Sequence, residues 1–269
     1  MISFPHAKIN LGLSIISKRP GGFHNLETIF YPLPLRDILE IVPVGKFRFI
    51  TTGLAVPGNT NDNLVLRAYH LLKKQYPRIT ESEIHLHKAI PMGAGMGGGS
   101  SDAAGTLLLI NQIFDLQISV ADLETYALEL GSDCPFFIQN MACFAGGRGE
   151  KLEPVPLDLS GYSILLIHPD IRIETGWAFS KVKPAETKSD LKKNILEPVH
   201  NWQKTIHNDF EKPVFEIYPI LQKIKDQLYN AGALYASMTG SGSTIFGIFY
   251  KSALPEIFIE NACQTRING

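Results

Sequence analysis

The chain has 269 residues, a formal net charge of −1 and 45% hydrophobic residues. Such a composition suits a globular protein with a sizeable core and excludes a disordered chain, which combines low hydrophobicity with high net charge. The charge balance, without a long basic tract, argues against a nucleic-acid partner, and the strand-length apolar runs argue against a membrane-spanning helix.

Patterns in the first half predict both strands and helices. The period-two alternation of Ala7–Ile15 predicts a strand that ends in a turn at Lys18–Gly22. Leucines on one helical face predict a helix over Asn63–Tyr76, capped by Asp62 or Asn63. Further strands are predicted over Asp37–Val42, Phe47–Thr51 and Glu83–His87, and further helices over Ala103–Phe114 and from Ser119 to about Gly131.

The second half also mixes strands and helices. A turn is predicted at Gly146–Glu150, a linker at Pro154–Pro156, strands over Tyr162–His168, Tyr235–Thr239 and Ile245–Tyr250, and a helix over Ile217–Ala231 that Gly232 closes. Residues 183–208 are weakly patterned and suggest surface helices or a flap. Because strict βαβ alternation is absent, we expect an α+β architecture in two domains, 1–155 and 156–269.

Cysteine usage indicates the compartment. The three cysteines, Cys134, Cys143 and Cys263, are odd in number and form no CxxC pair, which argues against a disulfide framework or a structural zinc site. The N-terminus lacks the basic and apolar regions of a signal peptide, so we expect a cytoplasmic protein. Cys134 is better explained as a packed small hydrophobe than as a nucleophile. The oligomeric state stays open between a monomer and a homodimer.

A glycine-rich stretch is the strongest chemical signal. Five of the seven residues from Gly93 to Gly99 are glycine. Each costs ~1 kcal/mol against alanine inside a helix, so the stretch is predicted to be a loop that brings backbone N–H groups close to a ligand. A helix starting at Ser100, Ser101 or Asp102 would add the free N–H groups and positive dipole end that favour phosphate. No Gly-Lys-Ser/Thr follows, so this is not a Walker A loop, and the context of a dinucleotide fingerprint is missing.

Three segments together resemble the galactokinase, homoserine kinase, mevalonate kinase and phosphomevalonate kinase superfamily. They are Ala7–Leu11, Pro91–Asp102 and Met238–Thr244. Within the superfamily, the segments Lys8–Leu13, Lys18–Thr28, Gly131–Phe137 and Ala145–Glu150 resemble the 4-diphosphocytidyl-2-C-methyl-D-erythritol kinase family. The resemblance implies an N-terminal half like the second domain of ribosomal protein S5 and a ferredoxin-like C-terminal half. It also implies that ATP, with Mg²⁺, phosphorylates the 2-hydroxyl of a cytidine diphosphate-linked methylerythritol in the non-mevalonate route to isoprenoid precursors.

The same resemblance implies a catalytic pair, Lys8 and Asp133. Asp133 would accept the proton of the attacking hydroxyl, and Lys8 would hold Asp133 ionised and offset charge on the transferring phosphoryl group. On the residues alone, Asp133 is equally well a turn residue after Gly131, and Lys8 is an ordinary solvated lysine. The apolar alternates of its strand place Lys8 and Asn10 on the other face.

Further positions are implied to bind ATP and substrate. Phe23 stands where the family commonly has Tyr, so it keeps a stacking face for cytosine and loses a hydroxyl. The residues implied to bind ATP are Asn63, Lys88, Pro91, Met92, Gly93, Ala94, Gly95, Met96, Gly97, Gly98, Gly99, Ser100 and Ser101. Those implied to bind substrate are Asn10, Phe23, His24, Thr175, Phe179, Gly240, Ser241 and Gly242, with cytosine between Phe23 and Phe179.

No metal ligand is assigned from the sequence. The helix after the glycine loop offers an apolar run, Leu107–Ile110, where some superfamily members have a glutamate, so Mg²⁺ is expected to be carried by ATP, a loop serine and Asp133. Two alternatives stay open. One is another small-alcohol kinase of the superfamily, such as a mevalonate or homoserine kinase. The other is a non-catalytic ligand-binding regulator of the same fold.

Overall fold

The computed structural model describes residues 1–184, 190–253, 255 and 262–268. The chain splits into two compact units, each described here by itself. Unit 1 comprises Met1–Ala7, Leu35–Met92 and Gly97–Met141, and unit 2 comprises Lys8–Pro34, Gly93–Met96 and Ala142–Gly269. Of the predicted loop, Gly93–Met96 therefore belongs to unit 2 and its flanks belong to unit 1.

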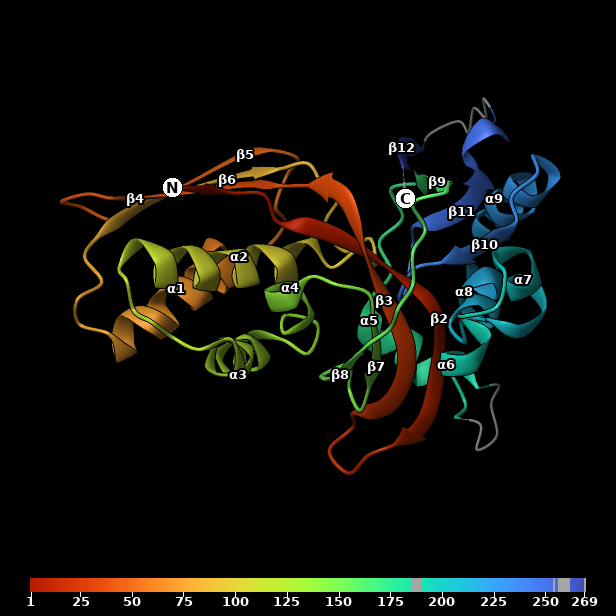
Figure 1. Cartoon of the computed structure of the whole chain (residues 1–269), viewed down its shortest axis with the longest axis horizontal. Coiled ribbons are helices and arrows are strands. Elements are labelled where there is room, and N and C mark those ends of the chain that lie inside the picture. Colours follow the sequence, from red (N-terminus) through yellow and green to blue (C-terminus); the bar gives the residue numbers. More distant parts are fainter. Residues whose placement is uncertain (185–189, 254, 256–261, 269) are drawn as a thin grey trace. The chain divides into compact units, whose positions relative to one another are not determined.

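Unit 1 is a four-stranded sheet with helices on one face (Figure 1). The sheet order is β1 (Ile2–Ser3), β4 (Ile38–Pro43), β6 (Ser82–Lys88), β5 (Arg48–Gly53). Only the β5–β6 pair is parallel among these neighbours. The helices are η1 (Thr60–Asp62), α1 (Leu64–Gln75), α2 (Gly98–Ile113), α3 (Val120–Leu130) and α4 (Phe136–Gln139).

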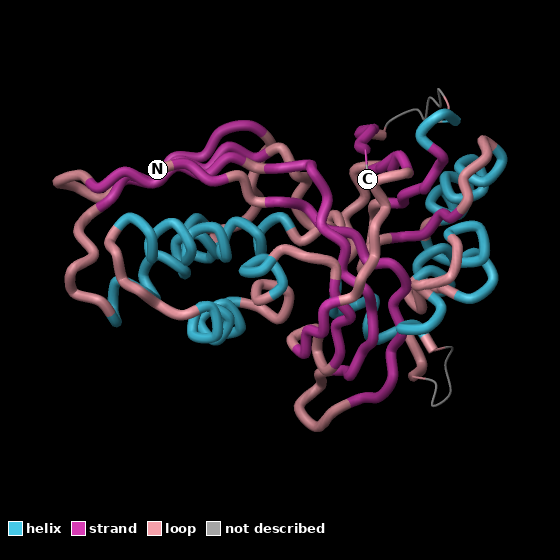
Figure 2. The backbone as a smooth tube through the Cα atoms, in the orientation of Figure 1, coloured by secondary structure: helices cyan, strands magenta, loops and turns pink. Residues whose placement is uncertain are grey.

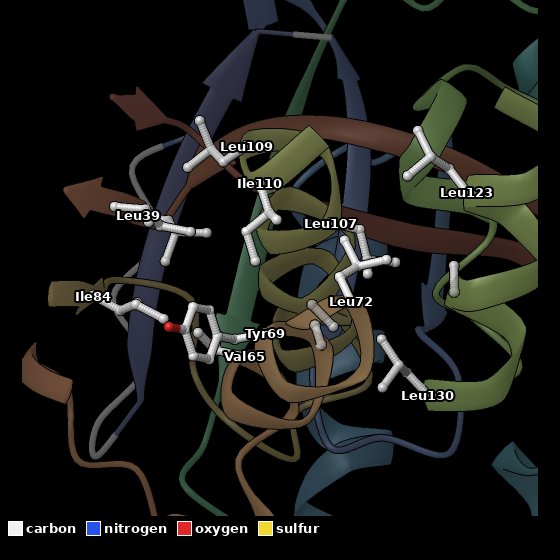
Figure 3. Close-up of a cluster of buried hydrophobic side chains, with 14 of the residues drawn as sticks. Leu39, Val65, Tyr69, Leu72, Ile84, Leu107, Leu109, Ile110, Leu123 and Leu130 are labelled. Carbon is white, nitrogen blue, oxygen red and sulfur yellow. The ribbon is translucent and has the colours of Figure 1, made fainter. Parts of the chain in front are cut away.

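The core of unit 1 lies between this sheet and its helices. Figure 3 shows Leu39 and Ile84 of the sheet on the same side of α2 as Tyr69 of α1 and Ile110 of α2, whereas Leu107 of α2 lies on the other side, toward Leu72. All six side chains are fully buried. Cys134 belongs to the same core, and burial raises the pKa of its thiol to about 12, which confirms its interpretation as a packed hydrophobe.

Unit 2 contains two further four-stranded sheets. One has the order β2 (His6–Lys18), β3 (His24–Arg36), β7 (Cys143–Gly146), β8 (Lys151–Pro154). The other is antiparallel, in the order β10 (Tyr235–Met238), β11 (Ile245–Tyr250), β9 (Tyr162–His168), β12 (Cys263–Asn268). The helices are α5 (Thr175–Lys181), α6 (Leu191–Asn194), η2 (Val199–Asn201), α7 (Trp202–Thr205), α8 (Glu211–Ile217), α9 (Pro219–Asn230) and η3 (Lys251–Ala253), coloured cyan in Figure 2.

Several predicted elements are confirmed by the structure. Asn63 caps α1 by accepting the Val65 backbone N–H, and Ser119 caps α3 through the Asp122 N–H. The predicted start of α2, at Ser100, Ser101, Asp102 or Ala103, was wrong, because α2 begins at Gly98. The helix predicted from Ile217 instead begins at Pro219, whose ring suits the first helical turn.

In the part of the chain that the structure describes, no helix has the length and apolar character needed to cross a bilayer.

Candidate active site

The glycine loop has the backbone geometry that its composition predicts. Gly95 has φ +78°, a left-handed conformation that residues with a Cβ rarely adopt. A Cβ there would lie 2.1 Å from the Thr239 carbonyl oxygen, so this close approach requires glycine. The loop also pairs with β2, because the Lys8 backbone N–H donates to the Met96 carbonyl at 3.0 Å.

The N-terminus of α2 follows directly within unit 1. Gly98 is buried, and a Cβ there would meet Ile90 Cγ2 at 3.0 Å and Lys88 Nζ at 3.2 Å, so glycine allows the first turn to pack this closely. The cap, Gly97, offers no side chain to the first-turn N–H groups. These N–H groups and the glycine-lined approach fit a phosphate group, which makes this helix end a suitable place for the phosphates of ATP.

A pocket of about 290 Å³ lies in unit 1 beside this helix end. Its apolar lining suits a flat base, and its polar lining includes the predicted nucleotide residues Asn63 and Lys88. Met92 and Gly99 of the glycine loop also line it. The remaining lining residues are Phe49, Thr51, Val56, Pro57, Gly58, Asn59, Thr60, Asp62, Leu64, Leu86 and Asp102.

Lys88 forms a buried ion cluster with two aspartates. Its ammonium donates to Asp37 and, at 2.7 Å, to Asp102, and all three side chains are buried. Asp37 also accepts the backbone N–H groups of Ala89 and Ile90. Burial raises the pKa of Asp102 to about 7, opposed by Lys88 and reinforced by the second carboxylate, Asp37. The ammonium is thus engaged by two carboxylates, and a nucleotide contact by Lys88 stays a prediction.

Lys8 is buried rather than solvated, so its interpretation as an ordinary surface lysine does not hold. It is 3% exposed on β2. Its Nζ donates to Asn10 Oδ1 and, at 3.0 Å, to the Gly95 carbonyl, and it lies 5.1 Å from the centroid of the Phe30 ring. The structure thus brings Lys8, Asn10 and the glycine loop together within unit 2.

Asp133 lies in unit 1, half-buried in the turn between α3 and α4. The next residues, Cys134, Phe136 and Phe137, are buried, and the two phenyl rings pack edge to face at 4.9 Å. Asp133 is thus followed directly by a buried, apolar stretch of chain. The pairing of Asp133 with Lys8 of unit 2 stays a prediction.

The residues implied to bind cytidine gather in unit 2. His24 and Phe179 are stacked, with ring centroids 4.9 Å apart, and the pKa of His24 is lowered by burial and by the charge of Lys18, which favours a neutral imidazole. Phe23 is 57% exposed, and the Arg148 guanidinium lies 5.0 Å from its ring centroid. The stacking partner that the structure gives Phe179 is His24, so a clamp of cytosine between Phe23 and Phe179 stays a prediction.

The turn that contains Gly240, Ser241 and Gly242 contacts Thr175, at the start of α5. Ser241 Oγ is 3.3 Å from Thr175 Oγ1, which joins two positions implied to bind substrate. Asn208 Nδ2 donates to the Met238 and Gly240 carbonyls at 2.7 and 2.8 Å and so fixes the turn.

Sequence reasoning missed several residues that contact the predicted site residues within each unit: Asp37 and Asp102 in unit 1, and Thr28, Arg148, Asn208 and Thr239 in unit 2. Thr239 Oγ1 accepts the Asn10 backbone N–H at 3.0 Å and lies 3.0 Å from the Gly95 carbonyl, so it links β2 to the glycine loop. These partners are far apart in the sequence, and no local pattern predicts such contacts. Four of them, Thr28, Asp102, Arg148 and Thr239, lie inside the segments that carry the family resemblance, which was the one available signal.

Two family models match this chain. The GHMP kinases N terminal domain matches residues 63–145, and the GHMP kinases C terminal model matches residues 189–265. The N-terminal match includes the glycine loop, Asp133 and the pocket-lining helix α1. The chain belongs to the GHMP kinases and is therefore an ATP-dependent small-molecule kinase.

Curated relatives narrow the family. A 4-diphosphocytidyl-2-C-methyl-D-erythritol kinase of Parabacteroides distasonis is 51% identical, covering 93% of this chain and 92% of the relative. One of Cytophaga hutchinsonii is 48% identical, covering 97% and 96%. A crystal structure of 4-(cytidine 5′-diphospho)-2C-methyl-D-erythritol kinase matches with TM-score 0.80 and 31% identity, covering 92% of this chain and 90% of that one. Within the GHMP kinases, this chain belongs to the 4-diphosphocytidyl-2-C-methyl-D-erythritol kinase family.

More distant structures share the fold alone. The mevalonate kinase of Methanococcus jannaschii matches with TM-score 0.71 at 14% identity, covering 100% of this chain and 98% of that one. Together with the family models, these matches confirm the predicted α+β kinase fold.

Proposed function

We propose that this chain transfers the γ-phosphoryl group of ATP to the 2-hydroxyl of 4-diphosphocytidyl-2-C-methyl-D-erythritol, with Asp133 as general base and Lys8 as its electrostatic partner. The observation that carries the choice of substrate is the close identity to relatives named for this activity, 51% over nearly the whole chain. We place the reaction in the non-mevalonate route to isoprenoid precursors and in the cytoplasm.

Nucleotide binding is proposed for unit 1 and its loop. The base would occupy the pocket beside Asn63, and the phosphates would accept hydrogen bonds from the first turn of α2 and from the glycine loop. Lys88 would hold the floor of this pocket through Asp37 and Asp102. We assign ATP binding to residues 1–155 and a contribution to the substrate site to residues 156–269.

A magnesium ion is proposed to be carried with ATP. The described residues contain no group of three or more His, Cys, Asp or Glu side chains that could hold a metal ion. Mg²⁺ is usually bound by one or two carboxylates together with the phosphates of the substrate, so one carboxylate and two serines suit a cation that arrives with the nucleotide. Ser100, Ser101 and Asp133 are the residues that would hold it, and its charge would neutralise the phosphates.

Substrate recognition is proposed for the aromatic residues of unit 2. Phe23 presents an exposed ring, and His24 and Phe179 present a stacked pair, which suits a cytosine that needs a flat partner and a polar edge contact. Asn10, Thr175 and the Gly240–Gly242 turn would then contact the rest of the substrate.

In the chemical step, this chain's own groups position and move one proton. Asp133 would accept the proton of the attacking 2-hydroxyl as its oxygen bonds to the γ-phosphorus, while the bond from that phosphorus to the β–γ bridging oxygen breaks and ADP leaves. Lys8 would offset the charge that builds up around the transferring group. Because phosphoryl transfer has a loose transition state, holding donor and acceptor in line accounts for much of the catalysis.

The test is coupled ADP release with purified protein, Mg²⁺-ATP and the cytidyl substrate, run beside mevalonate and homoserine. We expect turnover with the cytidyl substrate alone. Turnover only with another alcohol would show that the protein is a kinase of a different substrate and would contradict the proposed cytidine-binding site. ATP binding without turnover on any of the three would favour a ligand-binding regulator of the same fold.

A further inference from the structure

Asn10 is implied to bind substrate, yet most of its hydrogen-bonding capacity is used inside the protein. Its Oδ1 accepts from Lys8 Nζ and, at 3.3 Å, from the Thr239 hydroxyl, and its Nδ2 donates to Thr28 Oγ1 at 3.0 Å. Thr28 Oγ1 in turn donates to the Gly12 carbonyl. Lys8, Asn10 and Thr28 are 3%, 2% and 0% exposed, so this chain of hydrogen bonds is shielded from solvent.

Counting hydrogens gives this chain a direction. A threonine hydroxyl carries one hydrogen, and Thr28 directs it to the Gly12 carbonyl, which is an acceptor only. The Thr28 oxygen can therefore only accept from Asn10, so the NH₂ group of the Asn10 amide must face Thr28. The Asn10 carbonyl oxygen is then left to face the Lys8 ammonium.

The opposite orientation of the amide is unfavourable at both ends. A flipped Asn10 would direct its NH₂ group at the Lys8 ammonium, where two donors would meet. Its carbonyl oxygen would face the Thr28 oxygen, which has no hydrogen left to donate. A buried ammonium that loses an acceptor pays a large desolvation cost, so the orientation of Asn10 decides how well Lys8 is held.

We propose that Thr28 is a positioning residue for Lys8 and acts by fixing the orientation of the Asn10 amide. The Thr28 hydroxyl determines which way the Asn10 amide faces. The Asn10 amide carbonyl and the Gly95 carbonyl then accept hydrogen bonds from the Lys8 ammonium and hold it in position. The catalytic consequence rests on the proposed function of Lys8, whereas the effect on the ammonium itself does not.

The test compares Thr28→Val, which keeps the shape of the side chain and removes the hydroxyl, with Thr28→Ser, which keeps the hydroxyl. Thr106→Val is the matched control, because Thr106 is also 0% exposed and its Oγ1 donates to a backbone carbonyl, that of Asp102, at 2.8 Å. For Thr28→Val we expect kcat to fall by about 10- to 100-fold with little change in KM for ATP, as small misplacements of a reacting group do. Thr28→Ser and Thr106→Val should stay close to the wild type. Thr28→Ala serves if the valine variant does not fold.

A second readout needs no turnover. NMR can follow hydrogen exchange of the Lys8 ammonium, assigned by the loss of its ¹⁵Nζ–¹H signal in Lys8→Met. In Thr28→Val this exchange should become about tenfold faster, the size expected for one net hydrogen bond, and in Thr106→Val it should not change.

The outcomes separate the two claims. If ammonium exchange in Thr28→Val matches that in Thr106→Val, the positioning role is overturned, whatever happens to kcat. Faster ammonium exchange with unchanged kcat would show that the positioning of Lys8 by Thr28 does not contribute to catalysis, and would overturn that part of the proposal. Faster exchange in a protein that phosphorylates none of the tested alcohols would leave the positioning of Lys8 intact and contradict the proposed function instead.

Discussion

At the scale of single residues, the proposed chemistry depends on a carboxylate in one unit and an ammonium in the other. Asp133 is half-buried against the packed rings of Phe136 and Phe137, and Lys8 is buried among the carbonyls of Asn10 and Gly95. A general base needs an ionised carboxylate at the reacting hydroxyl, whereas ATP binding does not. The two functions are therefore separable by one substitution.

Asp133→Asn should lose turnover and keep ATP binding. The amide preserves the size of the side chain but cannot accept the proton, so kcat should fall by about 10²- to 10⁴-fold. Steady-state kinetics and calorimetric titration with a non-hydrolysable ATP analogue measure the two effects. Asp158→Asn is the control, because Asp158 is a turn carboxylate that accepts the Ser160 N–H. Near-normal turnover in Asp133→Asn would remove Asp133 from the mechanism.

Phe23→Ala should weaken binding of the cytidyl substrate. Loss of one base–aromatic stack typically costs ~1–3 kcal/mol, so KM for this substrate should rise by about tenfold or more while KM for ATP stays the same. Phe23→Tyr, which supplies the hydroxyl common in the family, should bind at least as well as the wild type. An unchanged KM in the alanine variant would show that this exposed ring does not stack on cytosine.

At the scale of elements, local patterns predicted what local forces decide. Three features could be predicted from the sequence because each depends on residues within a few positions: the alternation in β2, the Asn63 cap of α1 and the Ser119 cap of α3. The start of α2 could not be predicted from the sequence, because glycine has low helix propensity. Gly98 is needed there because a Cβ would come too close to Ile90. Strand β3 was missed, although its neighbour β2 directly precedes it, because its own sequence includes Pro32 and Pro34 and its other neighbour, β7, lies more than 100 residues away.

The candidate site shows the same limit. The resemblance placed Lys8, Asn10 and the glycine loop in one site, and the structure brings these three together. It did not indicate that Lys88 is held by Asp37 and Asp102, because an ion cluster across three elements leaves no periodic signal. Nor did it indicate that Phe179 stacks on His24, a contact between residues 155 positions apart.

The ion cluster of Asp37, which directly precedes β4, with Lys88 of β6 and Asp102 of α2 should make stability depend on pH. Asp102 has its pKa raised from 3.8 to about 7, so between those values the folded state binds a proton that the unfolded chain does not. The unfolding free energy should therefore fall as the pH rises through this window. Asp102→Asn removes the titration, so the wild-type free energy minus that of the variant should decrease from about pH 4 to about pH 7 and then level off. Urea unfolding across this range measures it, and a difference independent of pH would contradict the raised pKa.

At the scale of the whole molecule, each unit is assembled from separate stretches of chain. Leu13 and Ile15 of β2 belong to the same hydrophobic core as Phe249 and Leu221. The Leu13 N–H donates to the His207 carbonyl, and the Ile15 N–H donates to Asp209 at 2.7 Å. Residues near the start of the chain thus complete the core of its second half.

A fragment of residues 156–269 should therefore fold poorly alone. Without β2, its core lacks Leu13 and Ile15, and the backbone around His207 loses its partner, so we expect weak dispersion of NMR signals and no cooperative thermal transition. Adding the fragment 1–155 should restore both. A cooperative transition for the isolated fragment would show that the second half folds independently.

Phosphoryl transfer to the 2-hydroxyl can be followed by ³¹P NMR of the wild-type protein with Mg²⁺-ATP and 4-diphosphocytidyl-2-C-methyl-D-erythritol. We expect one new phosphomonoester signal on the methylerythritol, equal in amount to the ADP formed, with the substrate's diphosphate signals retained. Inorganic phosphate as the sole new product, or an ester that forms only with mevalonate or homoserine, would contradict it.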